Sequence, residues 1–317
     1  MQDKAGSFPE DASEGRIDIP ADGWVERWAP AWSRAYLRLG RFDRPIGTWL
    51  LLIPCWWGQA LATAETQGGW PDPLLMALFV VGSLAMRAAG CTVNDLADRD
   101  IDRKVARTRT RPLASGALSV RQGLAFMAAM CAIGLAVLLS LNPYCWALGA
   151  GVVGLIVLYP FMKRITYWPQ FVLGVTFNWG VLVGYAAVAG ELQASALILY
   201  AAGIAWTLGY DTIYAHQDKE DDLKVGVKSS ALALGGNTRP ALYAFYALTL
   251  AGIGLAGWQA GLSWVFWAGL GLAAAQLAWQ AARVDIDDPA DCLAKFKSNR
   301  DFGLIVLAAL AAGQVMA

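Results

Sequence analysis

Histidine is almost absent from this chain, which has only His216 among its 317 residues. A histidine-rich metal centre therefore cannot be built, and a Ser-His-Asp triad would have to use this one residue beside a row of acids. We expect His216 to be a satisfied polar residue instead. The five cysteines are scattered and contain no CxxC pair. That pattern argues against a disulfide framework, a zinc site and an iron–sulfur cluster.

Charge is also scarce, since only 16% of the residues are charged while 57% are hydrophobic. A chain this apolar is not an ordinary soluble domain and indicates a protein embedded in a lipid bilayer. Its apolar runs approach the ~20 residues that cross a membrane. We predict an all-α polytopic membrane protein with about nine transmembrane helices around a central cavity. The runs are Ile46–Ala64, Leu74–Cys91, Gly123–Leu141, Cys145–Met162, Phe171–Val188, Ala194–Tyr210, Ala241–Trp258, Trp264–Ala281 and Phe302–Ala317.

We expect no nucleic-acid partner and no obligate protein partner.

Lysine and arginine are missing from every second loop between these runs. Apart from Arg87, inside the second run, they fall in the N-terminal region or after the second, fourth, sixth and eighth runs. The positive-inside rule then places the N-terminus in the cytoplasm and the C-terminus on the opposite face. We expect a bacterial inner membrane.

The N-terminal residues 1–40 are polar and mixed in charge, which fits neither a signal peptide nor an acid-poor transit peptide. We interpret them as a cytoplasmic tail that precedes a membrane-embedded domain at 41–317. Trp24, Trp28, Trp32 and Tyr36 recur at helical spacing. This spacing favours a helix lying on the membrane surface. A plain disordered tail is the alternative.

Two acid-rich segments lie at the ends of the second and sixth runs, so both face the cytoplasm in this prediction. If each segment is helical, Asn94, Asp98 and Asp102 fall within an arc of roughly 80°. On the same assumption Asp211, Asp218 and Asp222 fall within roughly 40°. Two facing rows of hard oxygens suit Mg²⁺, whose remaining positions a substrate's phosphate oxygens can fill. The sequence therefore predicts a membrane enzyme that handles a diphosphate.

Basic residues follow both acidic segments. Arg107, Arg111 and Lys224 are expected to bind the diphosphate, since its charge needs cations beyond the metal. Lys163 and Arg164, at the end of the fourth run, have two interpretations. They are either an orientation signal alone or a receptor for an anionic cosubstrate.

Three strings, at 89–102, 107–116 and 210–222, resemble the intramembrane aromatic prenyltransferases. The resemblance extends from Arg41 to Asn299. The second acidic segment and the residues 224–229 after it are most similar to the branch that acts on 4-hydroxybenzoate.

The resemblance implies transfer of a polyprenyl group from polyprenyl diphosphate to the ring carbon next to the hydroxyl of 4-hydroxybenzoate, as in ubiquinone biosynthesis. It implies that Arg164 binds the acceptor carboxylate, with Arg41 as a second candidate, and that Asp211 and Tyr214 orient the acceptor or the second acidic row. The catalytic carboxylates would be Asp98, Asp102, Asp218 and Asp222. The Mg²⁺ ligands would be these four residues together with Asn94 and Asp95.

Other functions stay open at this point. The same chemistry on a naphthoate or a haem precursor is the alternative within the enzyme class. A divalent-cation or proton-coupled transporter is the rival from another class, because acids on membrane helices also mark ion paths. Both acidic segments end on one face, however, whereas transport sites need access from both faces. A structural scaffold has no reason to keep so many carboxylates near lipid.

Overall fold

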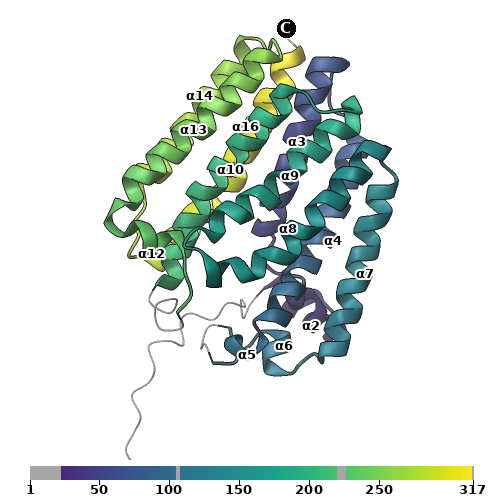
Figure 1. The fold of residues 1–317 in the computed structure, drawn as a ribbon, viewed down its shortest axis with the longest axis vertical. Helices are drawn as coiled ribbons and strands as arrows, with labels where there is room; N and C mark the ends of the chain where they lie inside the picture. Colours follow the sequence, from purple (N-terminus) through teal and green to yellow (C-terminus); the bar gives the residue numbers. More distant parts are fainter. Residues whose placement is uncertain (1–22, 105–107, 220–225, 316–317) are drawn as a thin grey trace, which may run out of the picture. The chain divides into compact units, whose positions relative to one another are not determined.

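The structure, a computed structural model, describes residues 23–104, 108–219 and 226–315, and these residues form helices and no strands (Figure 1). The chain divides into two compact units. The first unit comprises Met1–Arg44 and Ala88–Ala129, and the second comprises Pro45–Arg87 and Met130–Ala317. Each unit is described by itself below.

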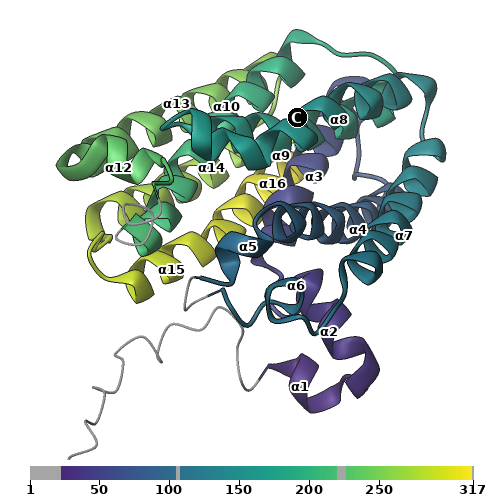
Figure 2. The same cartoon turned by 60° about the horizontal axis from the view of Figure 1, so that its bottom comes forward.

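The first unit gathers the short helices α1, α2, α5 and α6, which are labelled in Figure 2, around a small apolar core. Leu39, Leu113 and Leu118 are buried in it, and the rings of Tyr36 and Phe126 lie 5.8 Å apart beside them. This core joins α2 to the turn that contains α6. The helices are α1 (Trp24–Trp28), α2 (Ala31–Leu39), the end of α4 (Pro73–Ala97), α5 (Arg99–Asp102), α6 (Pro112–Ser115) and the start of α7 (Val120–Leu139).

The second unit contains the long helices. In Figure 1 the green helices α13 and α14 lie side by side, and α3 packs against α9 and α16. Proline stands in the first turn of several of these helices, where its missing N–H costs nothing. The helices are α3 (Ile46–Thr66), α8 (Pro143–Ile165), α9 (Pro169–Ala189), α10 (Ala194–Ala215), η2 (His216–Asp218), α12 (Ser230–Leu234), η3 (Gly235–Asn237), α13 (Thr238–Gln259), α14 (Trp264–Arg283), α15 (Pro289–Lys297) and α16 (Asn299–Val315).

Glycines bring α3 and α9 into backbone contact. A Cβ atom added to Gly58 would lie 2.0 Å from the carbonyl oxygen of Val181, and one added to Gly184 would lie 2.0 Å from that of Cys55. Small residues permit this approach, which is how helices pack in a membrane, where apolar burial alone does not drive association. Any larger residue at either position would force the two helices apart.

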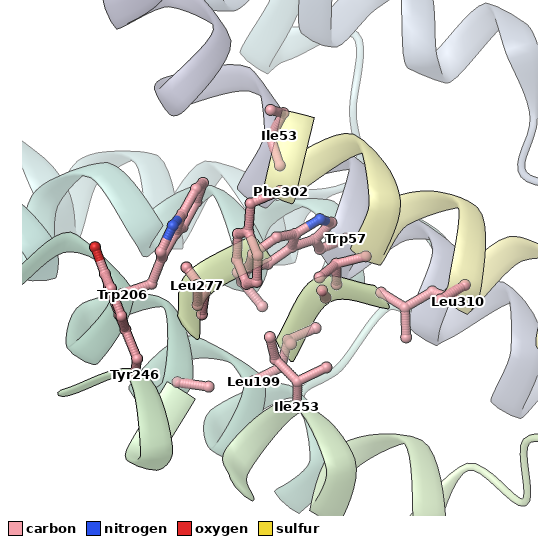
Figure 3. Close-up of a cluster of buried hydrophobic side chains, with 14 of the residues drawn as sticks. Ile53, Trp57, Leu199, Trp206, Tyr246, Ile253, Leu277, Phe302 and Leu310 are labelled. Atoms are coloured by element: carbon pink, nitrogen blue, oxygen red, sulfur yellow. The ribbon is translucent and has the colours of Figure 1, made fainter. Parts of the chain in front are cut away.

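A cluster of aromatic side chains fills the space among α3, α10 and α16 (Figure 3). The rings of Trp57 and Trp206 lie 5.0 Å apart, and Phe302 lies 5.3 Å from Trp206. Both indoles also satisfy their N–H groups. Trp57 donates to the carbonyl of Gly303 at 2.8 Å, and Trp206 donates to Oδ1 of Asn299 at 2.8 Å. The cluster therefore gives α10 and α16 a fixed register.

The helix surfaces identify a polytopic membrane protein. In α7 only Gly123 is buried, and in α8 only Cys145 and Pro160, although both helices are strongly apolar. The prediction of about nine spans is not confirmed. Within the described ranges, six stretches are long and apolar enough to cross a membrane, namely α4, α7, α8, α9, α10 and Ser230–Gln259. α16 has only 17 residues, and α3 and α14 carry tryptophans and glutamines that lower their hydropathy.

Candidate functional site

The first acidic segment lies where α4 gives way to α5. The predicted arc assumed a helical segment, but α4 ends at Ala97 and Asp98 interrupts the helix with φ −98° and ψ 2°. The helical step is nevertheless kept. Asp98 N–H donates to the carbonyl of Asn94 at 2.9 Å, and Asp102 N–H donates to that of Asp98 at 2.8 Å. Asn94, Asp98 and Asp102 therefore follow one another a turn apart, as the spacing predicted.

Two arginines contact two carboxylates of this segment. Nη2 of Arg41 lies 2.7 Å and 3.0 Å from the two carboxylate oxygens of Asp95. Nη1 of Arg111 lies 3.1 Å and 3.3 Å from the carboxylate oxygens of Asp102, and 3.4 Å from Oδ1 of Asp95. Asp95 and Asp102 are buried, at 1% and 6% exposure. Buried carboxylates of this kind stay ionised only when cations and hydrogen bonds compensate for the lost water.

The turn after α5 is fixed by its own side chains. Thr108 donates from Oγ1 to the carbonyl of Asp102 at 3.1 Å, and Arg103 donates from Nε to the carbonyl of Ala114 at 3.0 Å. The predicted diphosphate residue Arg111 thus lies against the acidic row. Arg107, the other arginine predicted for the diphosphate, lies outside the described residues.

Arg41 has a contact that the resemblance did not imply. Its role as the second candidate for the acceptor carboxylate stays a prediction, while its guanidinium bonds both oxygens of Asp95. The sequence did not predict this pair, because the two residues are 54 positions apart and only the folded first unit brings them together.

The second acidic segment begins on α10 and continues into η2. Asp211 is half-buried on α10, and the ring of Tyr214 lies 4.5 Å from that of Phe296 on α15. Lys219 forms an ion pair with Asp287, in the loop before α15. Lys219 also lowers the pKa of the Asp287 carboxyl, through their hydrogen bond. The predicted residues Asp222 and Lys224, and the side chain of Asp218, lie outside the described part of the chain.

His216 is neutral and buried. Its Nε2 lies 2.9 Å from Oγ1 of Thr238, which itself donates to the carbonyl of Gly235 at 2.8 Å. The imidazole is therefore the donor in the first bond, so its proton is on Nε2. Burial, together with the Lys219 charge, lowers the pKa of His216 to about 4. Nδ1 is buried and has no hydrogen-bond partner in the described chain, so the prediction of a satisfied histidine holds for one nitrogen only.

The chain after the second acidic segment is attached to the end of α8. Lys228 N–H donates to the carbonyl of Lys163 at 2.9 Å, and its Nζ donates to the carbonyl of Ile165 at 3.2 Å. A cation near the last carbonyls of a helix also favours the helix dipole. Arg164, the predicted acceptor residue, is exposed in this last turn of α8. The second unit therefore brings Arg164 and the segment after residue 225 together.

Arg87 is a candidate site residue that the sequence reasoning passed over. It lies within α4, with its guanidinium 5.6 Å from the ring centroid of Phe177, and it interacts electrostatically with Asp211. A Cβ atom on Gly47 would meet this guanidinium at 2.5 Å, so Gly47 leaves the space for it. The signal was present, because a charged residue inside an apolar span marks a functional site by default.

The first acidic row fits a hard divalent cation in the chemistry of its donors. Asp98 and Asp102 are more than nine-tenths buried, and the amide oxygen of Asn94 adds a neutral ligand. No cluster of three or more His, Cys, Asp and Glu side chains positioned for a metal ion occurs within the ranges that the structure describes. The prediction that the second row completes the site stays a prediction.

The chain matches the model of the UbiA prenyltransferase family over residues 51–306. It is 46% identical over 315 residues to the mitochondrial 4-hydroxybenzoate polyprenyltransferase of Arabidopsis thaliana, covering 99% of this chain and 77% of that protein. It is 48% identical to the human protein of the same name, covering 90% and 77%.

Solved structures show the same fold. The apo structure of a UbiA homolog from Aeropyrum pernix K1 matches with a TM-score of 0.68 and 29% identity, over 85% of this chain and 97% of that one. A UbiA homolog from Archaeoglobus fulgidus bound to GPP and Mg²⁺ matches with a TM-score of 0.61, over 89% and 100%, at 19% identity. At that identity the likeness concerns the fold alone.

The relatives correct the predicted location. Those from Arabidopsis thaliana and Homo sapiens are mitochondrial proteins of eukaryotes, so the prediction of a bacterial inner membrane with a cytoplasmic site is wrong. The reason is physical. Apolar runs and charge asymmetry report that a chain crosses a bilayer, but they carry no information about which membrane that is.

Proposed function

Because the chain belongs to the UbiA prenyltransferase family, we propose that it is a 4-hydroxybenzoate polyprenyltransferase. It transfers a polyprenyl group from polyprenyl diphosphate to the ring carbon next to the hydroxyl of 4-hydroxybenzoate and releases diphosphate, a step of ubiquinone biosynthesis. The observation that carries this proposal is the 46–48% identity, over nearly the whole chain, to proteins named for that activity. The buried acidic row with its arginines supports it, because carboxylates that could hold a metal ion lie beside cations that could bind a diphosphate.

The diphosphate end of the donor is proposed to bind at the first acidic row. Asn94, Asp98 and Asp102 would hold Mg²⁺ there, with Asp218 and Asp222 completing its ligands from the second segment. The bound metal would withdraw charge from the leaving diphosphate. Arg111 is already at Asp102 and would contact the diphosphate oxygens, with Arg107 and Lys224 as further cations.

The transfer itself needs few protein groups. The bond between the allylic carbon and the diphosphate oxygen breaks, and the electron pair leaves with the diphosphate. The ring carbon next to the hydroxyl then forms the new carbon–carbon bond, and the ring loses a proton. Water must be kept from the allylic cation, which the apolar helices achieve by enclosing the reacting end.

The acceptor is proposed to bind in the second unit. Arg87 and Arg164 are candidates for its carboxylate, since a guanidinium matches a carboxylate with two hydrogen bonds. Asp211, beside Arg87, would orient the acceptor hydroxyl, and Tyr214 would support the second acidic segment through Phe296.

Three further helices are proposed to cross the membrane, which gives about nine spans around a central cavity. At 1.5 Å per residue α3 is about 30 Å long, the thickness of the hydrocarbon core. α14 and α16 pack against each other, and α16 packs against α3. Accessibility of single cysteines placed along α3 to a soluble reagent tests this. A reactive middle of the helix would contradict it.

The N-terminal helices are proposed to lie on the membrane surface ahead of the membrane-embedded domain at 41–317. Trp28 and Trp32 are 82% and 78% exposed, beside the cationic Arg27 and Arg34. Trp side chains with basic neighbours are typical of the interface between lipid headgroups and water. A fluorophore at Trp32→Cys, in a chain without its native cysteines, should be quenched by brominated lipid. Absence of quenching would refute this placement.

The activity is tested with membranes that contain the chain, a short polyprenyl diphosphate, 4-hydroxybenzoate and Mg²⁺, beside Asp98→Ala and Asp218→Ala. We expect prenylated product that depends on the metal and on both carboxylates. If folded wild-type protein releases diphosphate but leaves 4-hydroxybenzoate unchanged, the acceptor is another ring such as a naphthoate. If it releases no diphosphate, the transporter becomes the leading hypothesis.

A further inference from the structure

Arg41 has an unusual backbone conformation. Its φ is +59°, and it is the only non-glycine residue with a positive φ in the ranges 23–104, 108–219 and 226–315. In this left-handed region the Cβ of an ordinary residue is crowded by its own backbone, so glycine is the usual choice. A non-glycine residue persists there only when its surroundings hold it, which marks a place where the side chain is needed.

The place of Arg41 at the end of α2 explains its positive φ. Arg41 follows the last turn of α2, where Gly40 N–H donates to the carbonyl of Tyr36 at 2.9 Å and Phe42 N–H donates to that of Leu37 at 3.0 Å. A left-handed residue at this point is a common way to end a helix, and glycine normally supplies it. Here Gly40 stands one residue earlier with φ −76°, so the left-handed position is occupied by an arginine.

The guanidinium is held firmly in one place. Nη2 bonds both oxygens of Asp95, and Nη1 donates to the carbonyl of Arg38 at 3.0 Å. Arg41 is 8% exposed and Asp95 only 1%. The left-handed backbone therefore aims the side chain into the protein, where it compensates a carboxylate that has almost no water.

These contacts leave Asp95 poorly suited to bind a metal ion. Oδ2 accepts from Arg41, and Oδ1 accepts from Arg41 and lies 3.4 Å from Arg111. Two guanidinium groups make the potential at this carboxylate unfavourable for Mg²⁺. Asp102 shares one of these cations, since Nη1 of Arg111 lies 3.1 Å and 3.3 Å from its carboxylate oxygens, whereas Asp95 faces both Arg41 and Arg111.

Asp95 nevertheless lies next to residues of the proposed metal and diphosphate site. It lies beside Asn94 in the last turn of α4, and it shares Nη1 of Arg111 with Asp102. A series of ion pairs thus connects Arg41, Asp95, Arg111 and Asp102. Moving Asp95 would move the end of α4, from which Asn94 and Asp98 extend, and would release Arg111 from its place.

We propose that Arg41 and Asp95 are a positioning pair that sets the first acidic row and Arg111, and that neither residue binds metal or acceptor. The inference rests on the proposed function, because it assigns roles within that site. It replaces the roles that the resemblance implied for these two residues.

The test is a double-mutant cycle of Arg41→Met, Asp95→Asn and the double variant, read out in two ways. The first readout is the melting temperature in detergent with EDTA, which needs neither metal nor activity. The second is the Mg²⁺ dependence of kcat and KM in the prenylation assay. Arg41→Met leaves a buried carboxylate unpaired, whereas the double variant removes both charges.

We expect Arg41→Met to lower both the melting temperature and kcat. We expect the double variant, with Asp95→Asn added, to have a kcat at least about tenfold higher than that of Arg41→Met alone. The Mg²⁺ concentration for half-maximal rate in Asp95→Asn should stay within about twofold of wild type. Arg41→Gly should also melt lower than wild type, because the lost ion pair outweighs the relieved backbone.

Two results would overturn the proposal. One is a double variant whose kcat and melting temperature are no higher than those of Arg41→Met. The other is Asp95→Asn with an unchanged melting temperature and about a tenfold higher Mg²⁺ requirement, as for a lost ligand.

The matched control is the Lys295–Asp291 pair in the second unit, joined at 2.7 Å. Its Lys295→Met and Asp291→Asn cycle should leave the Mg²⁺ requirement unchanged. If wild type prenylates no 4-hydroxybenzoate, the proposed function fails, while the melting cycle still decides whether the pair is coupled.

Discussion

Gly184→Ala should loosen the contact between α3 and α9. The added Cβ would lie 2.0 Å from the carbonyl oxygen of Cys55, with the carbonyl carbon at 2.9 Å and the Cα at 3.1 Å. All three atoms belong to the backbone, so no side-chain rotation can relieve the clash. Ordinary contact begins at 3.4 Å, so the helices must separate by roughly 1.4 Å at this point.

The magnitude follows from two opposing effects. Overpacking of a close interface costs about 1–3 kcal/mol, and the better helix propensity of alanine returns at most about 1 kcal/mol. A net loss of about 1–2 kcal/mol, divided by an unfolding entropy of about 2.1 cal/mol/K for each of the 317 residues, lowers the melting temperature by roughly 1.5–3 °C. The separation would also disturb Trp57, the residue next to Gly58 on the same helix, and with it the aromatic cluster around Trp206.

The assay is thermal unfolding of purified protein in one detergent, followed by loss of far-UV helical signal. Gly154→Ala on α8 is the matched control, because its added Cβ meets nothing within 4 Å. We expect that variant to melt at or slightly above the wild-type temperature. Equal melting temperatures for the two variants would refute the argument that the α3–α9 distance is set by glycine.

Three further predictions concern the site and its surroundings. Arg111→Met should lower kcat/KM for the donor about 10- to 100-fold, because it removes charged hydrogen bonds of about 1.5–3 kcal/mol. The control Arg121→Met, at an exposed position, should leave kcat/KM unchanged. Equal kcat/KM values for the two variants would exclude Arg111 from the site. EDTA should abolish product formation and Mg²⁺ should restore it, whereas a rate unaffected by EDTA would rule out the metal. Burial raises the pKa of Cys292 to about 12. In folded protein at pH 8 this thiol should therefore react with iodoacetamide about a thousandfold more slowly than after unfolding. Mass spectrometry of the labelled peptide measures both rates.

The first acidic row was largely predictable from the sequence. The spacing of Asn94, Asp98 and Asp102 by four residues places them a turn apart in any helical conformation, and the backbone bonds keep that step through the break at Asp98. The break itself was not predicted, because nothing in the local sequence is a strong helix breaker there. The family was also readable, since its motifs are local strings.

The ion pairs that join the two acidic segments to distant parts of the chain were not predictable. Arg41 and Asp95 are 54 residues apart, and Lys219 and Asp287 are 68 apart. No periodicity relates such positions, because the connecting chain can fold in many ways that satisfy the same local pattern. The resemblance implied a role for Arg41 at the acceptor, but it did not predict the Asp95 contact that the folded first unit shows. Arg87 carried a local signal, as a charge within an apolar run, but its partners Phe177 and Asp211 come from two other helices.

By itself the sequence determined that this is a helical membrane protein of a prenyltransferase type, because apolar run length, charge asymmetry and motif strings are properties of neighbouring residues. It also determined where the acids and most of the cations lie along the chain. Only the tertiary structure decided which charges meet. A carboxylate buried among apolar helices must find a cation, and which arginine can reach it depends on how turns such as the left-handed one at Arg41 aim side chains across the fold.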